Sequence, residues 1–317
     1  MTQQPPSLVI QIPGAGDCAD SVHIFDESSL WAIRAALAAN RPLLVRGEPG
    51  VGKSQLAHAA AVWLNRPFLS LVVDIRTESQ DLLSSFDAVQ RLAKAQICGA
   101  LREEKPEEVL AEWRFVHPGK LWWAFDWNDA KTQAERIRDP IPSSPEGWKP
   151  GEGCVLLIDE IDKAESDVPN GLLEALGSRS FPVRGRNEPV AVVGQAPLVV
   201  ITTNEDRMLP NAFIRRCLVL YLELPTDNDE LRKLLVKRGQ AHLPEMDSAL
   251  LEHAANLLIE ERNAAEAKHV RPLPGQAEYL DLIRAVFEIS RVEKSDPKSV
   301  LEAVKGFVLK KNAGSRA

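Results

Sequence analysis

The sequence lacks the features that typify membrane, secreted and zinc proteins. No apolar run approaches the roughly 20 residues that a membrane-spanning helix needs, and the first residues have neither the basic start nor the apolar stretch of a signal peptide. The four cysteines are scattered, without a C-x-x-C pair and without a histidine at ligand spacing. We therefore expect a cytoplasmic protein with reduced cysteines, no membrane insertion and no zinc.

The charge balance argues against one class of partner. The chain of 317 residues has a formal net charge of −7 at pH 7. Such an excess of negative charge disfavours sequence-independent binding along nucleic acid backbones. With 44% hydrophobic and 26% charged residues, the composition is that of an ordinary globular protein, and the length allows one large domain and a smaller one.

Short apolar runs, typical of buried parallel strands, alternate with helical patterns up to about Pro225, and only helical patterns follow. This change predicts an α/β domain at residues 1–225 and a smaller all-helical domain at residues 226–317. The expected strands occupy residues 41–46, 68–73, 154–160, 197–204 and 217–222. The expected helices occupy residues 27–40, 55–64, 80–101, 166–177, 227–242, 247–263, 274–291 and 297–309.

A tryptophan-rich segment, at about residues 102–153, interrupts this alternation. It shows no sustained period, and we interpret it as an insertion between core elements. Two readings stay open: the insertion contacts a partner, as long insertions in compact domains often do, or its aromatic side chains form a satellite cluster on the core. Its tryptophans are Trp113, Trp122, Trp123, Trp127 and Trp148.

One glycine-rich stretch fits G-x-x-x-x-G-K-[ST], the phosphate-binding loop of nucleoside triphosphatases. It follows an expected strand and precedes an expected helix, which is the context that such a loop requires. Its glycines let backbone N–H groups converge on an anion at the helix N-terminus. Lys53 would reach the β- and γ-phosphates, and the Ser54 hydroxyl would ligate Mg²⁺. The residues expected to bind nucleotide are Gly47, Glu48, Pro49, Gly50, Val51, Gly52, Lys53, Ser54 and Gln55.

Two acids follow the apolar run at residues 155–158. At the carboxyl end of a strand beside the glycine-rich loop, Asp159 would hold Mg²⁺ directly or through water. Glu160 would orient and deprotonate an attacking water. The alternative is an ordinary acidic turn after a strand. Because the sequence has no Asn-Lys-x-Asp, the pattern that reads guanine, we expect the nucleotide to be ATP.

Three further polar residues are candidates for the hydrolytic step. Asn204 ends an expected strand, which we expect to lie between the strand before the glycine-rich loop and the strand of Asp159. Its amide could there donate to the γ-phosphate or to the water. Taken alone, an asparagine at this point would be interpreted as the start of a turn. Arg215 and Arg216 end a short expected helix. Either could neutralise charge on a transferred phosphoryl group, from within the chain or from a neighbouring subunit. A surface ion pair is the alternative for one of them.

The ordered set of motifs resembles the AAA+ ATPases, and within them most closely the MoxR group. The resemblance covers roughly residues 20 to 290. It is carried by the glycine-rich loop, Ile158-Asp159-Glu160-Ile161-Asp162-Lys163-Ala164, Thr202-Thr203-Asn204, Leu209-Pro210-x-Ala212-Phe213-x-Arg215-Arg216-Cys217 and Arg271-Pro272.

This resemblance implies a P-loop αβα sandwich with a parallel five-stranded sheet, followed by a helical lid. It also implies a ring of identical subunits, usually hexameric, with ATP at subunit interfaces. Arg215 or Arg216 would enter the neighbour's site as the arginine finger, and Arg271 would be the lid sensor. MoxR-like proteins typically remodel or activate a protein partner, often one with a von Willebrand factor A domain.

The leading hypothesis is therefore an ATP hydrolase that uses ATP and Mg²⁺ to remodel a protein partner. One alternative is a nucleic-acid-associated motor or loader with the same core, which would need a basic stripe that the acidic total disfavours. Another is a nucleotide-gated signalling switch that hydrolyses slowly. An intact Glu160 argues against the switch.

Overall fold

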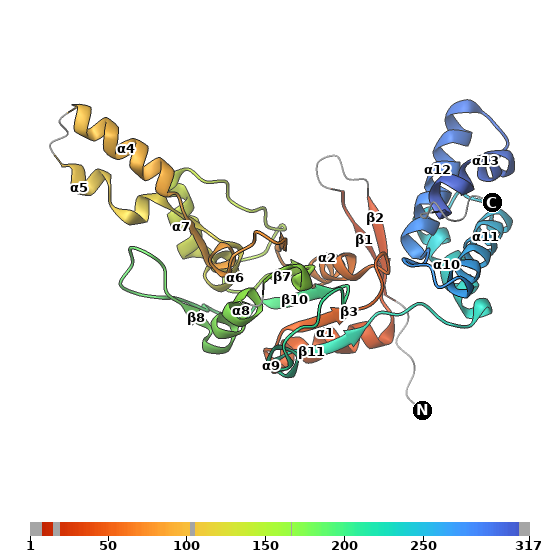
Figure 1. Ribbon diagram of the computed structural model, residues 1–317, viewed down its shortest axis with the longest axis horizontal. Helices are drawn as coiled ribbons and strands as arrows, with labels where there is room; N and C mark the ends of the chain where they lie inside the picture. The colour runs from red at the N-terminus through yellow and green to blue at the C-terminus, as the bar shows by residue number, and fades with distance from the viewer. Residues whose placement is uncertain (1–7, 15–19, 102–104, 166, 311–317) are drawn as a thin grey trace. The chain divides into compact units, whose positions relative to one another are not determined.

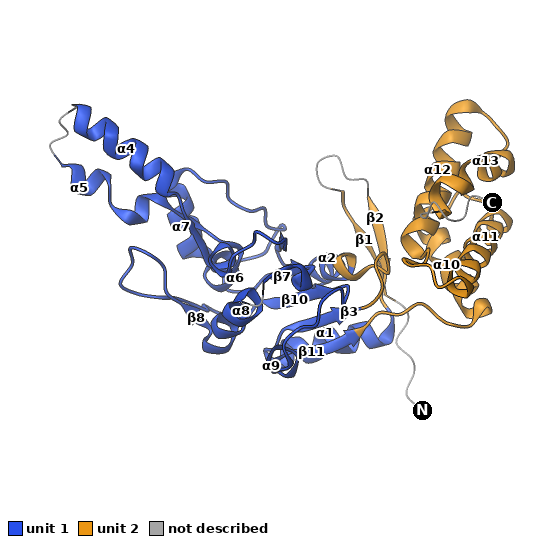
Figure 2. Ribbon diagram, in the orientation of Figure 1, with its two compact units in different colours: residues 1–4, 26–46, 56–220 blue, residues 5–25, 47–55, 221–317 orange. Residues whose placement is uncertain are grey.

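The described part of the chain folds as two compact units. The computed structural model describes residues 8–14, 20–101, 105–165 and 167–310. Unit 1 contains residues 26–46 and 56–220, and unit 2 contains the described residues of 5–25, 47–55 and 221–317 (Figures 1 and 2). The last junction between the units thus lies at Tyr221, near the change of pattern at Pro225. Unit 2 also takes in two earlier stretches of the chain.

A five-stranded parallel sheet forms the centre of unit 1, which confirms the predicted fold class. The three middle strands are apolar and almost fully buried, as strands covered on both faces must be. The spatial order is β11-β3-β10-β7-β4. The strands are β3 (Leu43–Arg46), β4 (Phe68–Val72), β7 (Val155–Asp159), β10 (Leu198–Thr203) and β11 (Leu218–Tyr221).

Helices and two small hairpins complete unit 1. The helices are α1 (Glu27–Ala39), α2 (Lys53–Leu64), α3 (Ser79–Leu83), α4 (Ala88–Leu101), α5 (Pro106–Val109), α6 (Lys120–Phe125), α7 (Trp127–Ile137), α8 (Asp167–Ser178) and α9 (Asn211–Arg216), with 3-10 turns at Glu112–Phe115 and Ile161–Lys163. The first three residues of α2 belong to unit 2. The hairpins pair β5 (Ser84–Phe86) with β6 (Val116–Pro118) and β8 (Ser180–Phe181) with β9 (Val190–Ala191).

The helix predicted for residues 80–101 is wrong as one element, because β5 interrupts it. The backbone N–H of Gly119 donates to the carbonyl of Leu83 (3.0 Å), and a side chain at Gly119 would meet the Leu82 carbonyl at 2.6 Å. This close approach of two backbones ends α3. The excursion from β5 to β6, which contains α4 and α5, is therefore an insertion that begins earlier in the chain than expected.

Part of the tryptophan-rich segment belongs to the core of unit 1. Residues 120–137 form α6 and α7, and Trp122, Trp123 and Trp127 are buried in the same cluster as the sheet. The Trp122 indole N–H donates to Asp129 (2.8 Å), which satisfies its one polar atom. The segment interpreted as an insertion therefore contains core elements at residues 120–137. The helix α6 is buried on nearly all sides and shows no amphipathic period, whereas α7 is amphipathic and buries one side.

Unit 2 contains a hairpin and four helices. The hairpin pairs β1 (Val9–Ile12) with β2 (Ser21–Ile24) in antiparallel register, so these residues do not join the α/β domain to which the sequence assigned them. The helices are α10 (Asn228–His242), α11 (Ser248–Ala267), α12 (Gln276–Glu293) and α13 (Pro297–Leu309). Aspartates at positions 227, 247 and 296 accept backbone N–H groups of the first turns and so begin α10, α11 and α13.

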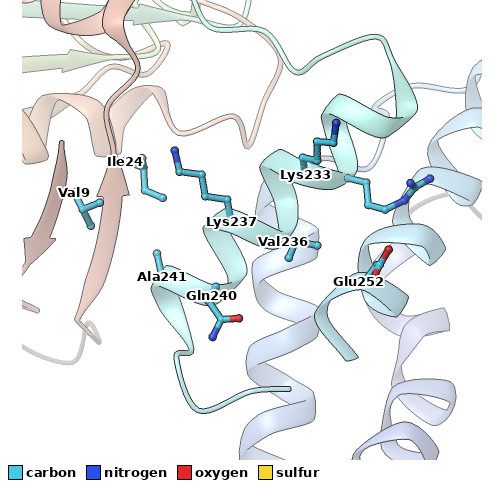
Figure 3. A pocket seen from close by; sticks show the side chains of 9 residues that line it. Val9, Ile24, Lys233, Val236, Lys237, Gln240, Ala241 and Glu252 are labelled. Atoms are coloured by element: carbon cyan, nitrogen blue, oxygen red, sulfur yellow. The ribbon is translucent and has the colours of Figure 1, made fainter. Parts of the chain in front are cut away.

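The hairpin and α10 share a groove of about 680 Å³ (Figure 3). Val9 and Ile24 face it from the strands, and Val236, Lys237 and Ala241 face it from α10. The hairpin is thus attached to the helices of unit 2. None of the helices in the described ranges combines the length and the apolar character that crossing a membrane would require.

Candidate functional site

The candidate residues of unit 1 lie at the carboxyl ends of adjacent parallel strands. Asp159 ends β7, and Glu160 follows it. Asn204 follows β10, which lies between β7 and β3 in the sheet, as expected. The strand β3 ends at Arg46, and the chain continues directly into the glycine-rich loop. In α/β sheets, this edge is where ligands bind.

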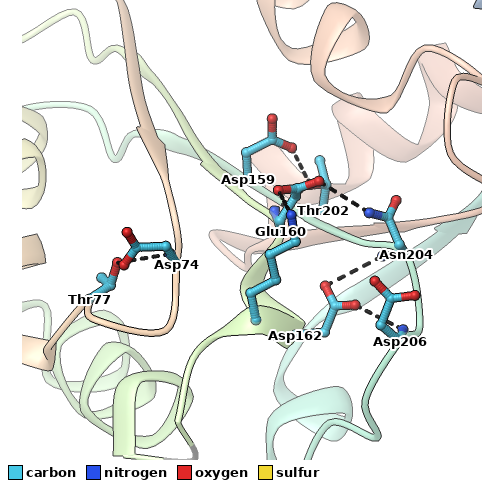
Figure 4. Close-up of polar contacts among 9 residues, drawn as sticks. Asp74, Thr77, Asp159, Glu160, Asp162, Thr202, Asn204 and Asp206 are labelled. Carbon is cyan, nitrogen blue, oxygen red and sulfur yellow. Dashed lines mark hydrogen bonds and ion pairs between the residues drawn. The ribbon is translucent and has the colours of Figure 1, made fainter.

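The Thr202 hydroxyl joins the two acids (Figure 4). It donates to the Asp159 carboxylate and accepts the backbone N–H of Glu160 at 2.9 Å. Thr202 is fully buried, so these contacts replace the water that both groups would otherwise bind. Thr202 therefore fixes the direction of one acid and the backbone of the next. Sequence reasoning had given it no role of its own.

Glu160 adopts a left-handed backbone conformation, with φ 59° and ψ 46°. Such a conformation is costly for a residue with a β-carbon, and it is often found at functional sites. Its two carboxylate oxygens have separate partners: Oε1 accepts the Asn204 amide (3.2 Å), and Oε2 pairs with Lys163 Nζ (2.5 Å). This hydrogen bond raises the pKa of Lys163. The amide of Asn204 is thus directed at the acid, a contact that the sequence had not suggested.

A third acid, which is buried, holds the segment after β10. Asp162 is 2% exposed, and its carboxylate accepts the backbone N–H groups of Asn204 (3.4 Å) and Asp206 (2.9 Å). These contacts connect the turn after β7 to the turn after β10 (Figure 4). Asp162 belongs to the motif that carried the family resemblance, but only the fold reveals this positioning contact.

The glycine-rich loop packs within unit 2. Val51 is buried in the same hydrophobic cluster as α10, α11 and α12. A side chain at Gly47, whose φ is +150°, would lie 2.1 Å from the Leu222 carbonyl, so no other residue fits there without a shift of the backbone. Lys53 Nζ donates to the carbonyls of Gly47 (2.8 Å) and Glu48 (2.9 Å).

Two arginines converge on the loop glutamate. Arg271, the predicted lid sensor, pairs with Glu48 Oε1 (2.8 Å), and Arg262 of α11 pairs with Glu48 Oε2 (2.8 Å). Arg262 also donates to the Pro274 carbonyl (3.1 Å). Sequence reasoning missed Arg262, because a single arginine in the middle of a helix carries no motif.

The pair Arg215 and Arg216 ends α9, as the sequence predicted. Arg41, which lies just before β3, donates to the carbonyls of both residues, with Nε 3.1 Å from the Arg216 oxygen. A cation at the C-terminus of a helix also interacts favourably with the helix dipole. Arg41 therefore fixes the backbone from which the two candidate finger arginines project.

No group of three or more His, Cys, Asp or Glu side chains in the described part of the chain could hold a metal ion. This agrees with the way in which Mg²⁺ binds in triphosphatases, where one or two protein oxygens act together with substrate phosphates and water. Asp159, at the end of β7, has a carboxylate oxygen of the kind that Mg²⁺ prefers.

The chain matches the model of one protein family, described as AAA domain (dynein-related subfamily), over residues 42–238. No curated protein matches it. Among solved structures, a variant of Thermotoga maritima RuvB is 17% identical, with 88% of this chain and 68% of that chain covered and a TM-score of 0.46. Another, the Thermotoga maritima RuvB Holliday junction branch migration motor, is 18% identical, with coverages of 88% and 67% and a TM-score of 0.43.

Proposed function

Because the chain belongs to the AAA domain family in its dynein-related subfamily, we propose that it is a MoxR-like ATP hydrolase that remodels or activates a protein partner. One observation carries the hydrolytic part of this proposal. The Glu160 carboxylate, next to a candidate magnesium ligand, is held between an amide and an ammonium group at the ligand-binding edge of the sheet.

Each polar residue of unit 1 has a separate task in this proposal. Glu160 takes the proton of the attacking water, since its carboxylate directly follows the candidate magnesium ligand Asp159 at the end of β7. Asn204 holds one oxygen of that carboxylate and so fixes its direction. Thr202 positions Asp159, which would bind Mg²⁺ together with Ser54. The metal would neutralise the phosphates of the nucleotide during transfer.

The loop supplies binding. Backbone N–H groups of the glycine-rich loop at the start of α2 would hold the phosphates. Lys53, which donates to two carbonyls of the loop in this structure, would exchange those acceptors for the β- and γ-phosphates, because a charged oxygen is the stronger acceptor. Gly50 and Gly52 have φ values of +78° and +100°, which glycine adopts without strain.

The finger arginines lead to a prediction about assembly. We propose that Arg215 or Arg216 completes the site of a neighbouring copy in a ring, which would be hexameric by analogy with the family. ATP hydrolysis would then move the helices of unit 2, and the ring would transmit this motion to a protein client. The insertion between β5 and β6 is our proposed contact for that client, because it extends beyond the sheet and its helices (Figure 1).

The test is ATP hydrolysis as a function of protein concentration. We expect the activity per subunit to rise with concentration and to reach a plateau, because the finger comes from another copy. Full activity in a monomer at high dilution would contradict the shared site.

Two variants then test the assigned roles. Lys53→Ala should abolish ATP binding. Glu160→Gln should bind ATP, lose turnover and accumulate as an assembled ring that electron microscopy can count. Glu188→Gln, which changes an exposed glutamate of unit 1, is the control. Normal hydrolysis by Glu160→Gln would show that another group is the base.

A further inference from the structure

Glu48 occupies an unusual position for a negative charge. It belongs to the loop that would hold a triphosphate, where another anion is unfavourable. Its two carboxylate oxygens each accept one guanidinium group, Oε1 from Arg271 and Oε2 from Arg262, both at 2.8 Å. The carboxylate is therefore neutralised from two sides, and its place in the loop brings both arginines to the phosphate-binding residues.

The two arginines are held unequally. The Arg262 side chain is 15% exposed and has a second acceptor, the Pro274 carbonyl. The Arg271 side chain is 65% exposed, and among the described residues Glu48 is its one hydrogen-bonded partner. An exposed ion pair contributes little and exchanges readily. Arg262 is thus the fixed partner of Glu48, and Arg271 is the exchangeable one.

From this asymmetry we infer that Glu48 competes with a bound triphosphate for Arg271, while Arg262 keeps Glu48 in place. The inference rests on the proposed function, and it adds a positioning role for Glu48 and Arg262. Without nucleotide, Arg271 stays on Glu48. With ATP, the γ-phosphate offers the guanidinium group more negative charge than one carboxylate does, and Arg271 moves to it. ADP lacks that group, so Arg271 remains on Glu48.

This competition sets how well the protein distinguishes ATP from ADP. The contact with Glu48 must be broken before Arg271 can bind ATP, so Glu48 lowers the affinity for ATP. A glutamate that only attached the loop to α11 would have the opposite effect, because its loss would loosen the loop and weaken binding of both nucleotides.

The experiment measures equilibrium binding of fluorescent ATP and ADP analogues to the full chain. We expect Glu48→Gln to bind the ATP analogue about threefold to fivefold more tightly, which is the scale of the exposed ion pair that Arg271 no longer has to break. The carboxamide keeps one acceptor oxygen for Arg262. Binding of the ADP analogue should change less than about twofold. Arg271→Ala should cancel the gain when it is combined with Glu48→Gln.

Glu245→Gln is the matched control, because Glu245 is an exposed glutamate of unit 2 without an ion pair among the described residues. If Glu48→Gln does not fold, Glu48→Asp replaces it, since its shorter side chain cannot reach both arginines and should also favour ATP. ATP binding by Glu48→Gln that equals or falls below that of Glu245→Gln would overturn the inference. A gain that persists without Arg271 would overturn it too.

Failure of the proposed function would look different. In that case the wild-type chain would bind neither analogue, or Lys53→Ala would bind both as well as the wild type does. If the wild type binds, Lys53→Ala does not, and Glu48→Gln behaves as Glu245→Gln does, then only the role of Glu48 is wrong.

Discussion

Replacing Thr202 with valine tests whether one hydroxyl organises the acids. The change keeps the shape of the side chain and removes both of its hydrogen bonds, to the Asp159 carboxylate and from the backbone N–H of Glu160. Since Thr202 is fully buried, water cannot replace the lost partner without rearrangement. The left-handed backbone conformation of Glu160 then lacks the hydrogen bond that its N–H makes in the wild type.

The expected cost follows from these two contacts. A hydrogen bond to a charged group contributes about 1.5–3 kcal/mol, and an unsatisfied buried N–H costs about 1–3 kcal/mol. The additional buried methyl group of the valine stabilises the folded state by about 1 kcal/mol. We expect Thr202→Val to lower the unfolding free energy by about 1.5–5 kcal/mol, which corresponds to roughly 3–20 °C in the Tm of a unit of this size. Turnover should fall about tenfold to a hundredfold, because the base is no longer held in position.

Thermal unfolding and steady-state ATP hydrolysis are the two assays. Thr202→Ser keeps the hydroxyl and should retain most of the turnover. Thr203→Val is the matched control, because this neighbouring buried hydroxyl accepts the N–H of Glu205 and not that of Glu160. It should lose stability with a much smaller loss of turnover. A Thr202→Val protein with unchanged Tm and unchanged turnover would refute the reasoning.

Three further predictions concern other parts of the chain. Trp122→Ala should lower the unfolding free energy by about 3–5 kcal/mol in urea titrations, because it empties a fully buried site. Gly47→Ala should abolish nucleotide binding, since the β-carbon of the alanine would collide with the Leu222 carbonyl. Gly99→Ala is the contrasting change: the space around Gly99 is open, and the substitution should stabilise α4 by up to about 1 kcal/mol. Burial lowers the pKa of His242 from its ordinary value of 6.5. As the pH falls, the unfolded chain therefore protonates this imidazole first, and the free energy of unfolding decreases below about pH 6.5. In urea unfolding, His242→Gln should lose less stability than the wild type between pH 7.5 and pH 5.5.

Much of the sheet could be predicted from the sequence. Its middle strands, β3, β7 and β10, are buried on both faces, so each reads as a continuous apolar run, and the polar residues that follow them mark the edge where ligands bind. The four helices of unit 2 were equally visible, because their apolar periodicity is a local signal, and α10, α11 and α13 also have an aspartate N-cap.

Other features depend on the whole fold and leave no local signal. The left-handed backbone of Glu160 arises in the turn after β7, and the hydroxyl that supports it comes from Thr202, on the neighbouring strand. The contact between Arg262 and Glu48 joins residues 214 positions apart. The buried helix α6 was missed for another reason, since a helix that is apolar on nearly all sides has no period to detect. The next helix, α7, is amphipathic, and its buried side is short and contains a glutamine, Gln133, among its four residues.

The arrangement around α9 shows how such a long-range contact bears on function. Arg41 precedes β3, and its guanidinium group donates to the last carbonyls of α9, 174 and 175 positions later. The N–H of Leu218, the first residue of β11, donates to the carbonyl of Pro42, so the strand that follows α9 is bound to the start of β3. The strand that leads into the phosphate-binding loop therefore also fixes the helix that carries Arg215 and Arg216. If the protein forms the ring that we propose, a shift of β3 would reach both the glycine-rich loop and the candidate finger arginines. Nucleotide binding in one copy would then be coupled to the arginines that this copy presents to the next.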